Sequence, residues 1–159
     1  MATDAQTDFL PRIPASAGAL IFDAAGRLLI LKPTYKKGWT IPGGQIEEGG
    51  ESPWEACKRE TLEECGIAVE RGRLVCVDFL HPKPDRPGGA RFIFDCGTVD
   101  EATIAAISLQ AQEISEHRFV EHVDALELLS GPLRRRVTEA RAGDGFVYLE
   151  DGRRVADVQ

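Results

Sequence analysis

The sequence predicts a mixed α/β fold. Apolar segments of strand length recur along the chain, and one segment between them carries both the start and the stop signals of a helix. The chain has 159 residues, which is a usual size for one domain. We therefore expect residues 1–159 to form a single α/β domain, with a loose leader over 1–14 and a hairpin-like tail over 144–159.

The expected strands are apolar segments bounded by turn residues. The first two, 17–22 and 27–31, flank the sequence Asp23-Ala24-Ala25-Gly26, which is typical of a hairpin turn. Further strands are expected over 74–80, 91–96 and 116–120, and a closing hairpin is expected over 146–149 and 153–155.

The first expected helix follows a glycine-rich loop. Ser52 can cap it, Pro53 fits its first turn, and Gly66 can end it in a left-handed conformation. Two more helices are expected later in the chain, a short one over 123–129 and a basic one over 131–142.

Charge and composition exclude several classes of protein. The formal net charge is −7, whereas a general binder of nucleic acid or anionic membranes needs a basic surface. We interpret the basic run Arg134-Arg135-Arg136 as a solvated helix face in preference to an RNA contact. No segment approaches the roughly 20 apolar residues of a membrane span, and the first residues do not resemble a secretory signal. The four cysteines form no CxxC pair, so we expect buried, reduced thiols in a cytoplasmic protein.

Three glutamates lie at helical spacing before Gly66. An α-helix advances about 100° per residue, so Glu60, Glu63 and Glu64 fall within an arc of about 100°. Like charges this close raise one another's pKa and destabilise the helix unless a cation neutralises them. Magnesium suits this face because it takes oxygen ligands and bridges carboxylates to phosphates. A solvated acidic surface is the alternative, and the neighbouring glycine loop favours the metal site.

The segment 44–67 resembles the Nudix box. The family pattern is a glycine, five residues, a glutamate, seven residues, and then Arg-Glu-aliphatic-x-Glu-Glu-x-Gly-aliphatic. The positions that match in one register are Glu51, Arg59, Glu60, Glu63, Glu64, Gly66 and Ile67. The lead-in Trp39-x-x-Pro42-Gly43-Gly44 is also similar to that of the family. So many fixed positions make this signal much more specific than a lone glycine motif.

Two positions depart from the pattern. Six residues rather than five separate Gly44 from Glu51, and Thr61 stands where the family prefers an aliphatic side chain. The insertion precedes the helix, so the spacing of the carboxylates is unchanged. We expect the extra residue to bulge away at Gly49 and Gly50, because glycine adopts backbone angles that other residues avoid.

The resemblance implies a Nudix-like α/β/α sandwich with a mixed central β-sheet, and a magnesium-dependent reaction. By analogy with the family, the metal ligands are Glu60, Glu63, Glu64 and the backbone carbonyl of Gly44. Mn²⁺ is the expected substitute for Mg²⁺. Arg59 is expected to orient Glu60.

The resemblance also implies a glutamate that acts as general base. We prefer Glu113 for this role and keep Glu116 as the alternative. The candidates for substrate binding are Lys32, Lys36 and Lys37 as phosphate contacts, Trp39 as a stacking surface for a base, and Glu51 as a support of the loop or of an outer metal position.

The activity implied by the resemblance is hydrolysis of a pyrophosphate bond in a nucleoside diphosphate linked to another group. Nucleoside triphosphates, ADP-ribose or nucleotide sugars, dinucleoside polyphosphates and capped RNA ends all fit this description. One alternative is a non-catalytic Nudix-like module that senses a nucleotide, and another is a structural domain with an incidental acidic helix. The complete glutamate set favours the enzyme. The expected partner is a small nucleotide, without membrane or nucleic acid, and the sequence is compatible with a homodimer.

Overall fold

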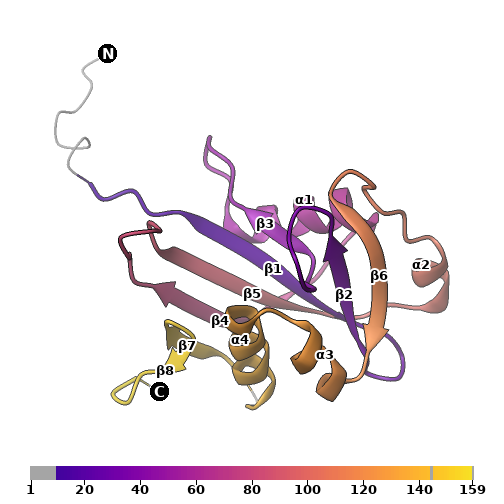
Figure 1. The fold of residues 1–159 in the computed structure, drawn as a ribbon. Coiled ribbons are helices and arrows are strands. Elements are labelled where there is room, and N and C mark those ends of the chain that lie inside the picture. Colours follow the sequence, from indigo (N-terminus) through magenta and orange to yellow (C-terminus); the bar gives the residue numbers. More distant parts are fainter. Residues whose placement is uncertain (1–9, 144, 159) are drawn as a thin grey trace.

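The computed structural model of the chain describes residues 10–143 and 145–158, and it has an α/β/α architecture (Figure 1). The expected fold class is therefore confirmed. Residues 1–9 of the expected leader, and residues 144 and 159 of the expected tail, lie outside the described residues.

The bounds of the elements agree with the sequence prediction to within a few residues. The strands are β1 (Ala15–Phe22), β2 (Leu28–Pro33), β3 (Gly43–Gln45), β4 (Arg73–Leu80), β5 (Gly89–Thr98), β6 (Ile114–Val120), β7 (Val147–Glu150) and β8 (Arg153–Arg154). The helices are α1 (Pro53–Cys65), α2 (Glu101–Ala105), α3 (His122–Leu128) and α4 (Gly131–Arg141). Strand β3 and helix α2 were not predicted, because both are too short to show a periodic pattern.

All the described strands belong to one mixed sheet. Its order is β6-β2-β1-β5-β4-β7-β8, and β3 pairs with β1 beside this path. The pairs β1–β5 and β4–β7 are parallel, whereas the other pairs are antiparallel. The closing hairpin was expected as a tail, but β7 extends the main sheet through its parallel pairing with β4.

Two strands, β2 and β3, pair with the same edge of β1. Near its start, Ala17 is opposite Gly44 of β3, and near its end, Phe22 is opposite Leu28 of β2. The expected β1–β2 hairpin therefore separates soon after its turn. This arrangement places the glycine strand β3 beside the middle of the sheet.

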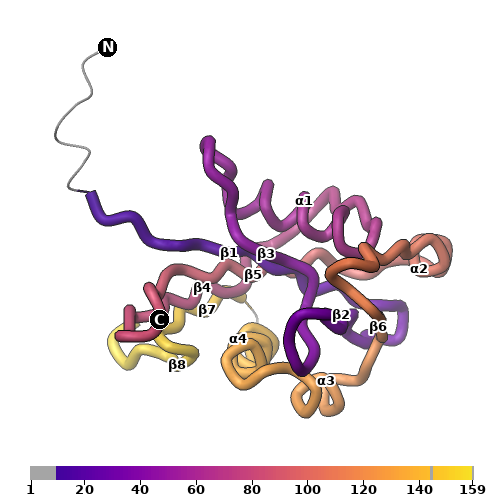
Figure 2. Tube along the Cα trace, turned by 45° about the horizontal axis from the view of Figure 1, so that its top comes forward, coloured from indigo at the N-terminus to yellow at the C-terminus, as the bar shows by residue number. Residues whose placement is uncertain are grey.

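The two faces of the sheet pack against different helices (Figure 2). Alternate residues of a strand point to opposite faces, so Leu28 and Ile30 of β2 belong to the cluster that includes α3 and α4. Leu29 and Leu31 belong to the cluster that includes α1. The two helical layers are thus separated by one apolar sheet.

Helix α1 forms where its capping residues predict. Ser52 accepts the backbone N–H of Glu55, whose side chain accepts the backbone N–H of Ser52, and Gly66 ends the helix with φ 75°. Cys57, Thr61 and Cys65 are buried on the face that packs on the sheet. Glu64 is also buried beside this face, whereas Glu60 is partly buried and Glu63 is exposed, so the three glutamates turn progressively away from the sheet.

The four cysteines are free thiols, and three of them are buried as expected, whereas Cys96 is only partly buried. Among the described helices, none has the length and apolar composition needed to cross a membrane.

Candidate active site

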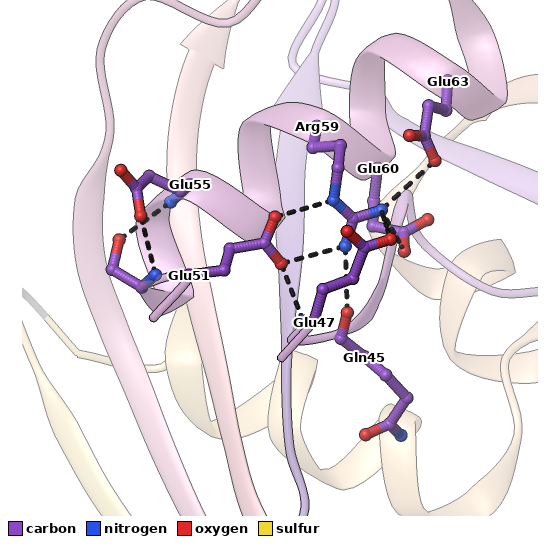
Figure 3. Close-up of polar contacts among 8 residues, drawn as sticks. Gln45, Glu47, Glu51, Glu55, Arg59, Glu60 and Glu63 are labelled. Carbon is purple, nitrogen blue, oxygen red and sulfur yellow. Dashed lines mark hydrogen bonds and ion pairs between the residues drawn. The ribbon is translucent and has the colours of Figure 1, made fainter. Parts of the chain in front are cut away.

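Arg59 joins helix α1 to the glycine-rich loop (Figure 3). Its Nε and Nη2 donate to the two carboxylate oxygens of Glu51 at 2.7 and 3.0 Å, and Nη2 also donates to the carbonyl of Gln45 at 3.0 Å. Its Nη1 donates to Glu60 at 2.9 Å and to Glu63 at 3.2 Å. The hydrogen bonds from Arg59 lower the pKa of Glu51 to about 2, so Glu51 stays ionised.

A pocket of about 390 Å³ lies between this helix, strands β3, β1 and β5, and the start of α4. Glu60 and Glu64 of α1 and Glu113 from the loop before β6 all line it. Three of the predicted glutamates, from segments about 50 residues apart in the chain, therefore meet at one pocket.

Glu64 is the most deeply buried carboxylate of this pocket. It is 4% exposed, and its Oε2 accepts the backbone N–H of Gly43 at 3.2 Å. Burial raises its pKa to about 8, and the nearby charges of Glu60 and Glu113 act in the same direction. Burial also raises the pKa of Glu60, although the hydrogen bond from Arg59 opposes this change. On the side of the pocket formed by α1, the carboxylates are therefore not fully compensated by positive charge.

Gly44 lies directly against Glu60. A Cβ at this position would be 2.5 Å from the carboxyl carbon of Glu60, so a larger residue would displace that side chain. The neighbouring Gly43 has φ 153°, and a Cβ there would be 2.3 Å from the carbonyl oxygen of Ala17. Strand β3 thus depends on Gly43 for its close approach to the backbone of β1, whereas Gly44 leaves the Glu60 side chain in place.

The extra loop residue lies in a turn that does not line this pocket. Gly49 and Gly50 have φ values of 94° and 92°, and a Cβ on either would meet nothing within 4 Å. Gly44 lines the pocket although the loop is one residue longer than the family pattern. The placement agrees with the expected bulge, and the carbonyl of Gly44 as a metal ligand stays a prediction.

The remaining candidates are divided between the pocket and its surroundings. Glu63 is 47% exposed at its side chain and contacts Arg59 outside the pocket lining. Glu116 pairs with Arg118 on β6 and is also outside it, so the geometry favours Glu113 over Glu116. Among the lysines, Lys36 lines the pocket, whereas Lys32 and Lys37 do not.

Trp39 occupies a different place from the one expected of a base-stacking residue. It is 7% exposed within the core, and the guanidinium of Arg118 lies 4.7 Å from its ring centroid. Its ring is therefore already covered on one side. Two other aromatic residues, Tyr35 and Phe92, line the pocket instead.

Comparison with known proteins decides the family. Residues 12–140 match the sequence profile of the NUDIX domain. This chain belongs to the Nudix family. An uncharacterized Nudix hydrolase of Pseudomonas aeruginosa is 33% identical over 117 residues, which cover 68% of this chain and 63% of that relative. The match thus spans less than two thirds of the relative's length.

Two solved structures extend this similarity to the fold. The MutT protein of Methanosarcina mazei Go1 is 25% identical, with a TM-score of 0.68 over 83% of this chain and 94% of that chain. An Ap4A hydrolase of C. elegans, solved as a binary complex, is 26% identical, with a TM-score of 0.57 over 77% of this chain and 95% of that chain.

The Nudix glutamates fit a divalent cation in their chemistry. Glu60 and Glu64 offer hard oxygen donors next to Gly44, which has no side chain to push Glu60 away, and burial raises the pKa of Glu64 in the absence of a cation. Over 10–143 and 145–158, no three acidic, histidine or cysteine side chains already converge on one point. Metal binding would thus require the carboxylates to move closer together, and Glu60 to share its contact with Arg59.

This Nudix pocket also has a cationic side that was not predicted from the sequence. Arg91 of β5 and Arg136 of α4 both line it, and Arg136 Nε donates to the fully buried Asp78 at 2.6 Å. The interpretation of the whole run 134–136 as a solvated face is therefore wrong for Arg136. No local pattern could reveal this pair, because its partners are 58 residues apart in the chain.

Proposed function

We propose that this Nudix protein is a Mg²⁺-dependent hydrolase that cleaves a pyrophosphate bond in a nucleotide-linked substrate. The observation that carries the proposal is the meeting of Glu60, Glu64 and Glu113 at one pocket, with Glu64 buried and its pKa raised to about 8. Burial of a carboxylate lowers the stability of the fold, so a buried carboxylate at a pocket indicates a functional role. A bound cation would neutralise the carboxylates and offset this loss of stability.

Glu60 and Glu64, beside Gly44, are the residues that would hold the metal, and Glu63, which lies outside the pocket lining, would have to turn toward them to join. When bound, Mg²⁺ would neutralise the charge of the diphosphate and activate a water molecule for attack on phosphorus. Mn²⁺ is expected to substitute for it.

The other side chains at the pocket would position Glu60, bind the substrate and accept a proton. Arg59, itself fixed by both oxygens of Glu51, keeps Glu60 turned toward the glycine strand. Lys36 would contact a phosphate as a flexible positive charge. A carboxylate oxygen of Glu113 would accept the proton of the attacking water. Tyr35, which is 67% exposed at the pocket, would supply a surface for the base.

The decisive experiment is a hydrolysis screen with Mg²⁺ over nucleoside triphosphates, ADP-ribose, nucleotide sugars, dinucleoside polyphosphates and capped RNA. We expect turnover of at least one class and its loss in chelator. Glu64→Gln keeps the side-chain volume and should lower turnover by about 100-fold or more. The matched control is Glu70→Gln, because Glu70 is exposed and outside the pocket.

A nucleotide-sensing module is the alternative that the screen separates. It would bind a nucleotide at the same pocket with no turnover in Mg²⁺ or Mn²⁺. The similarity to an Ap4A hydrolase supports an enzyme acting on a phosphate-rich nucleotide. Full activity of Glu64→Gln, or full activity in chelator, would refute the assignment of the metal site.

A further inference from the structure

A second hollow lies beside the pocket, between the β4–β5 loop, helix α4 and the β7–β8 hairpin. Its volume is about 620 Å³, and Arg136 lines both hollows. Its lining contains six cationic side chains, Lys83, Arg86, Arg135, Arg136, Arg153 and Arg154, and two carboxylates, Glu150 and Asp151. We call it the basic groove. It stands out because the whole chain carries a net charge of −7.

Ion pairs within the fold account for only part of this charge. Arg136 pairs with Asp78, Arg154 with Glu139 and Arg86 with Asp85, while Asp151 is occupied by His81. In the described part of the chain, no carboxylate lies within 4.0 Å of the cationic groups of Lys83, Arg135 or Arg153. Unpaired like charges gathered in a hollow repel one another, so an anionic ligand would stabilise them.

The groove depends on a part of the chain outside the family match. The NUDIX match ends at residue 140, whereas Arg153 and Arg154 belong to the β7–β8 hairpin. The hairpin is fixed at its turn, where the backbone N–H of Gly152 donates to Oδ1 of Asp78 at 2.9 Å. Oδ2 of the same carboxylate holds Arg136. One buried side chain thus joins the added hairpin to the wall of the catalytic pocket.

We propose that the basic groove binds a chain of phosphates. If the proposed hydrolase function holds, the groove takes the phosphate-bearing far end of the substrate whose scissile bond lies in the neighbouring pocket. Arginine side chains suit this ligand, because their planar guanidinium groups form paired hydrogen bonds with phosphate oxygens. Arg136 lines both hollows, so the groove begins at the wall of the pocket. The preferred substrate then carries further phosphates beyond the scissile diphosphate.

The first test measures the groove without catalysis. Inorganic tripolyphosphate is titrated into the full chain in chelator, at low and at high salt, by calorimetry. We expect binding that weakens with salt. In the double variant Arg135→Gln/Arg153→Gln, binding should be about tenfold weaker or more, the usual loss for a hydrogen bond to a charged group.

The matched control removes the same charge elsewhere. Arg71→Gln/Arg73→Gln changes two exposed arginines that line neither hollow, and it should bind within about twofold of the wild type. If both double variants lose the same affinity for tripolyphosphate, the proposed binding at the groove is wrong and the attraction is nonspecific. Absence of tripolyphosphate binding to the wild type would also overturn it, and would leave the hydrolase proposal untouched.

The second test asks whether the groove serves the substrate. In Mg²⁺, Arg135→Gln/Arg153→Gln should raise KM for diadenosine tetraphosphate about tenfold with little change in kcat, and should leave ADP-ribose within about twofold. Equal effects on the two substrates, or no effect on either, would refute the link to the substrate. If the wild type hydrolyses neither compound, the hydrolase proposal fails for both of them. The affinities of the wild type and of the double variant for the two compounds then show whether the groove contributes to their binding.

Discussion

The burial of Glu64 lowers the stability of the fold, whereas the proposed metal site needs its carboxylate. Its side chain is 4% exposed and accepts one backbone N–H, which is less than an ionised carboxylate needs when it is removed from water. Burial raises its pKa to about 8. In the metal-free protein at neutral pH, the folded state therefore favours the protonated form of Glu64.

This raised pKa predicts how stability depends on pH without metal. Between the ordinary value of 4.5 and about 8, the folded protein keeps a proton that the unfolded chain releases. The free energy of unfolding should therefore fall as pH rises through this interval, by at most about 1.4 kcal/mol per pH unit. Urea unfolding in chelator at pH 5 and pH 8 measures the change.

Glu64→Gln is the comparison for that measurement, because glutamine cannot titrate. The variant should lose the part of the pH dependence that comes from this site, and should be more stable than the wild type at pH 8. Glu70→Gln should follow the wild type. An unchanged pH dependence in Glu64→Gln would show that Glu64 is ionised in the folded state without metal.

Substitution of Gly44 should reduce activity without unfolding the protein. In Gly44→Ala the new methyl group would meet the end of the Glu60 side chain at 2.5 Å, and this side chain can turn away. We expect the fold to survive and turnover to fall about 100-fold, because Glu60 loses its position. Gly143→Ala is the control, since nothing lies within 4 Å of its Cβ. Turnover in Mg²⁺ and thermal unfolding of both variants test this, and unfolding of Gly44→Ala would contradict it.

At the scale of elements, the extended loop between β3 and α1 gives the next prediction. Its turn contains Gly49 and Gly50 and does not line the pocket that holds Glu60 and Glu64. Deletion of Gly50 restores the spacing of the family and should keep Mg²⁺-dependent turnover within about tenfold, because α1 and β3 keep their contacts through Arg59.

The contrasting variant is Gly43→Ala, whose Cβ would meet the backbone of Ala17 at 2.3 Å and which should lose both stability and turnover. Turnover and unfolding are measured on both. If deletion of Gly50 is as damaging as Gly43→Ala, the loop carries part of the site.

Helix α1 was the most predictable element and β3 the least. The bounds of α1 follow from its own residues, since Ser52 caps its start and Gly66 ends it. Strand β3 has three residues, two of them glycines, and exists because β1 is beside it. For the same reason the box glutamates were predictable as a set, whereas the burial of Glu64 and the exposure of Glu63 depend on where α1 packs.

At the scale of the whole molecule, Asp78 connects three segments that are distant in the chain. It lies on β4, accepts the N–H of Gly152 from the β7–β8 turn, and pairs with Arg136 of α4. The parallel pairing of β4 with β7 brings these segments together. Such a pairing cannot be read from local patterns, because it joins residues about 70 positions apart.

Asp78→Asn would leave Arg136 buried without a counter-charge. We expect a loss of roughly 3–5 kcal/mol in the free energy of unfolding, as for other broken buried ion pairs. The double variant Asp78→Leu/Arg136→Met removes both charges and should recover part of this loss. Urea unfolding measures all three proteins, with Asp95→Asn as the control from an exposed pair with Arg73. A loss below about 1 kcal/mol in Asp78→Asn would show that water reaches the pair.

The β7–β8 hairpin also determines how the sheet meets solvent. Without it, β4 would present a row of unpaired backbone groups around the apolar residues Val75, Cys76 and Val77, a template on which a second chain could add a strand. With it, the strand at this edge of the sheet is β8, which is two residues long and consists of two arginines, while β6 forms the other edge. An edge strand so short and so highly charged has few backbone groups with which another strand could pair. The residues that we assign to phosphate binding would therefore also protect this edge from edge-to-edge aggregation.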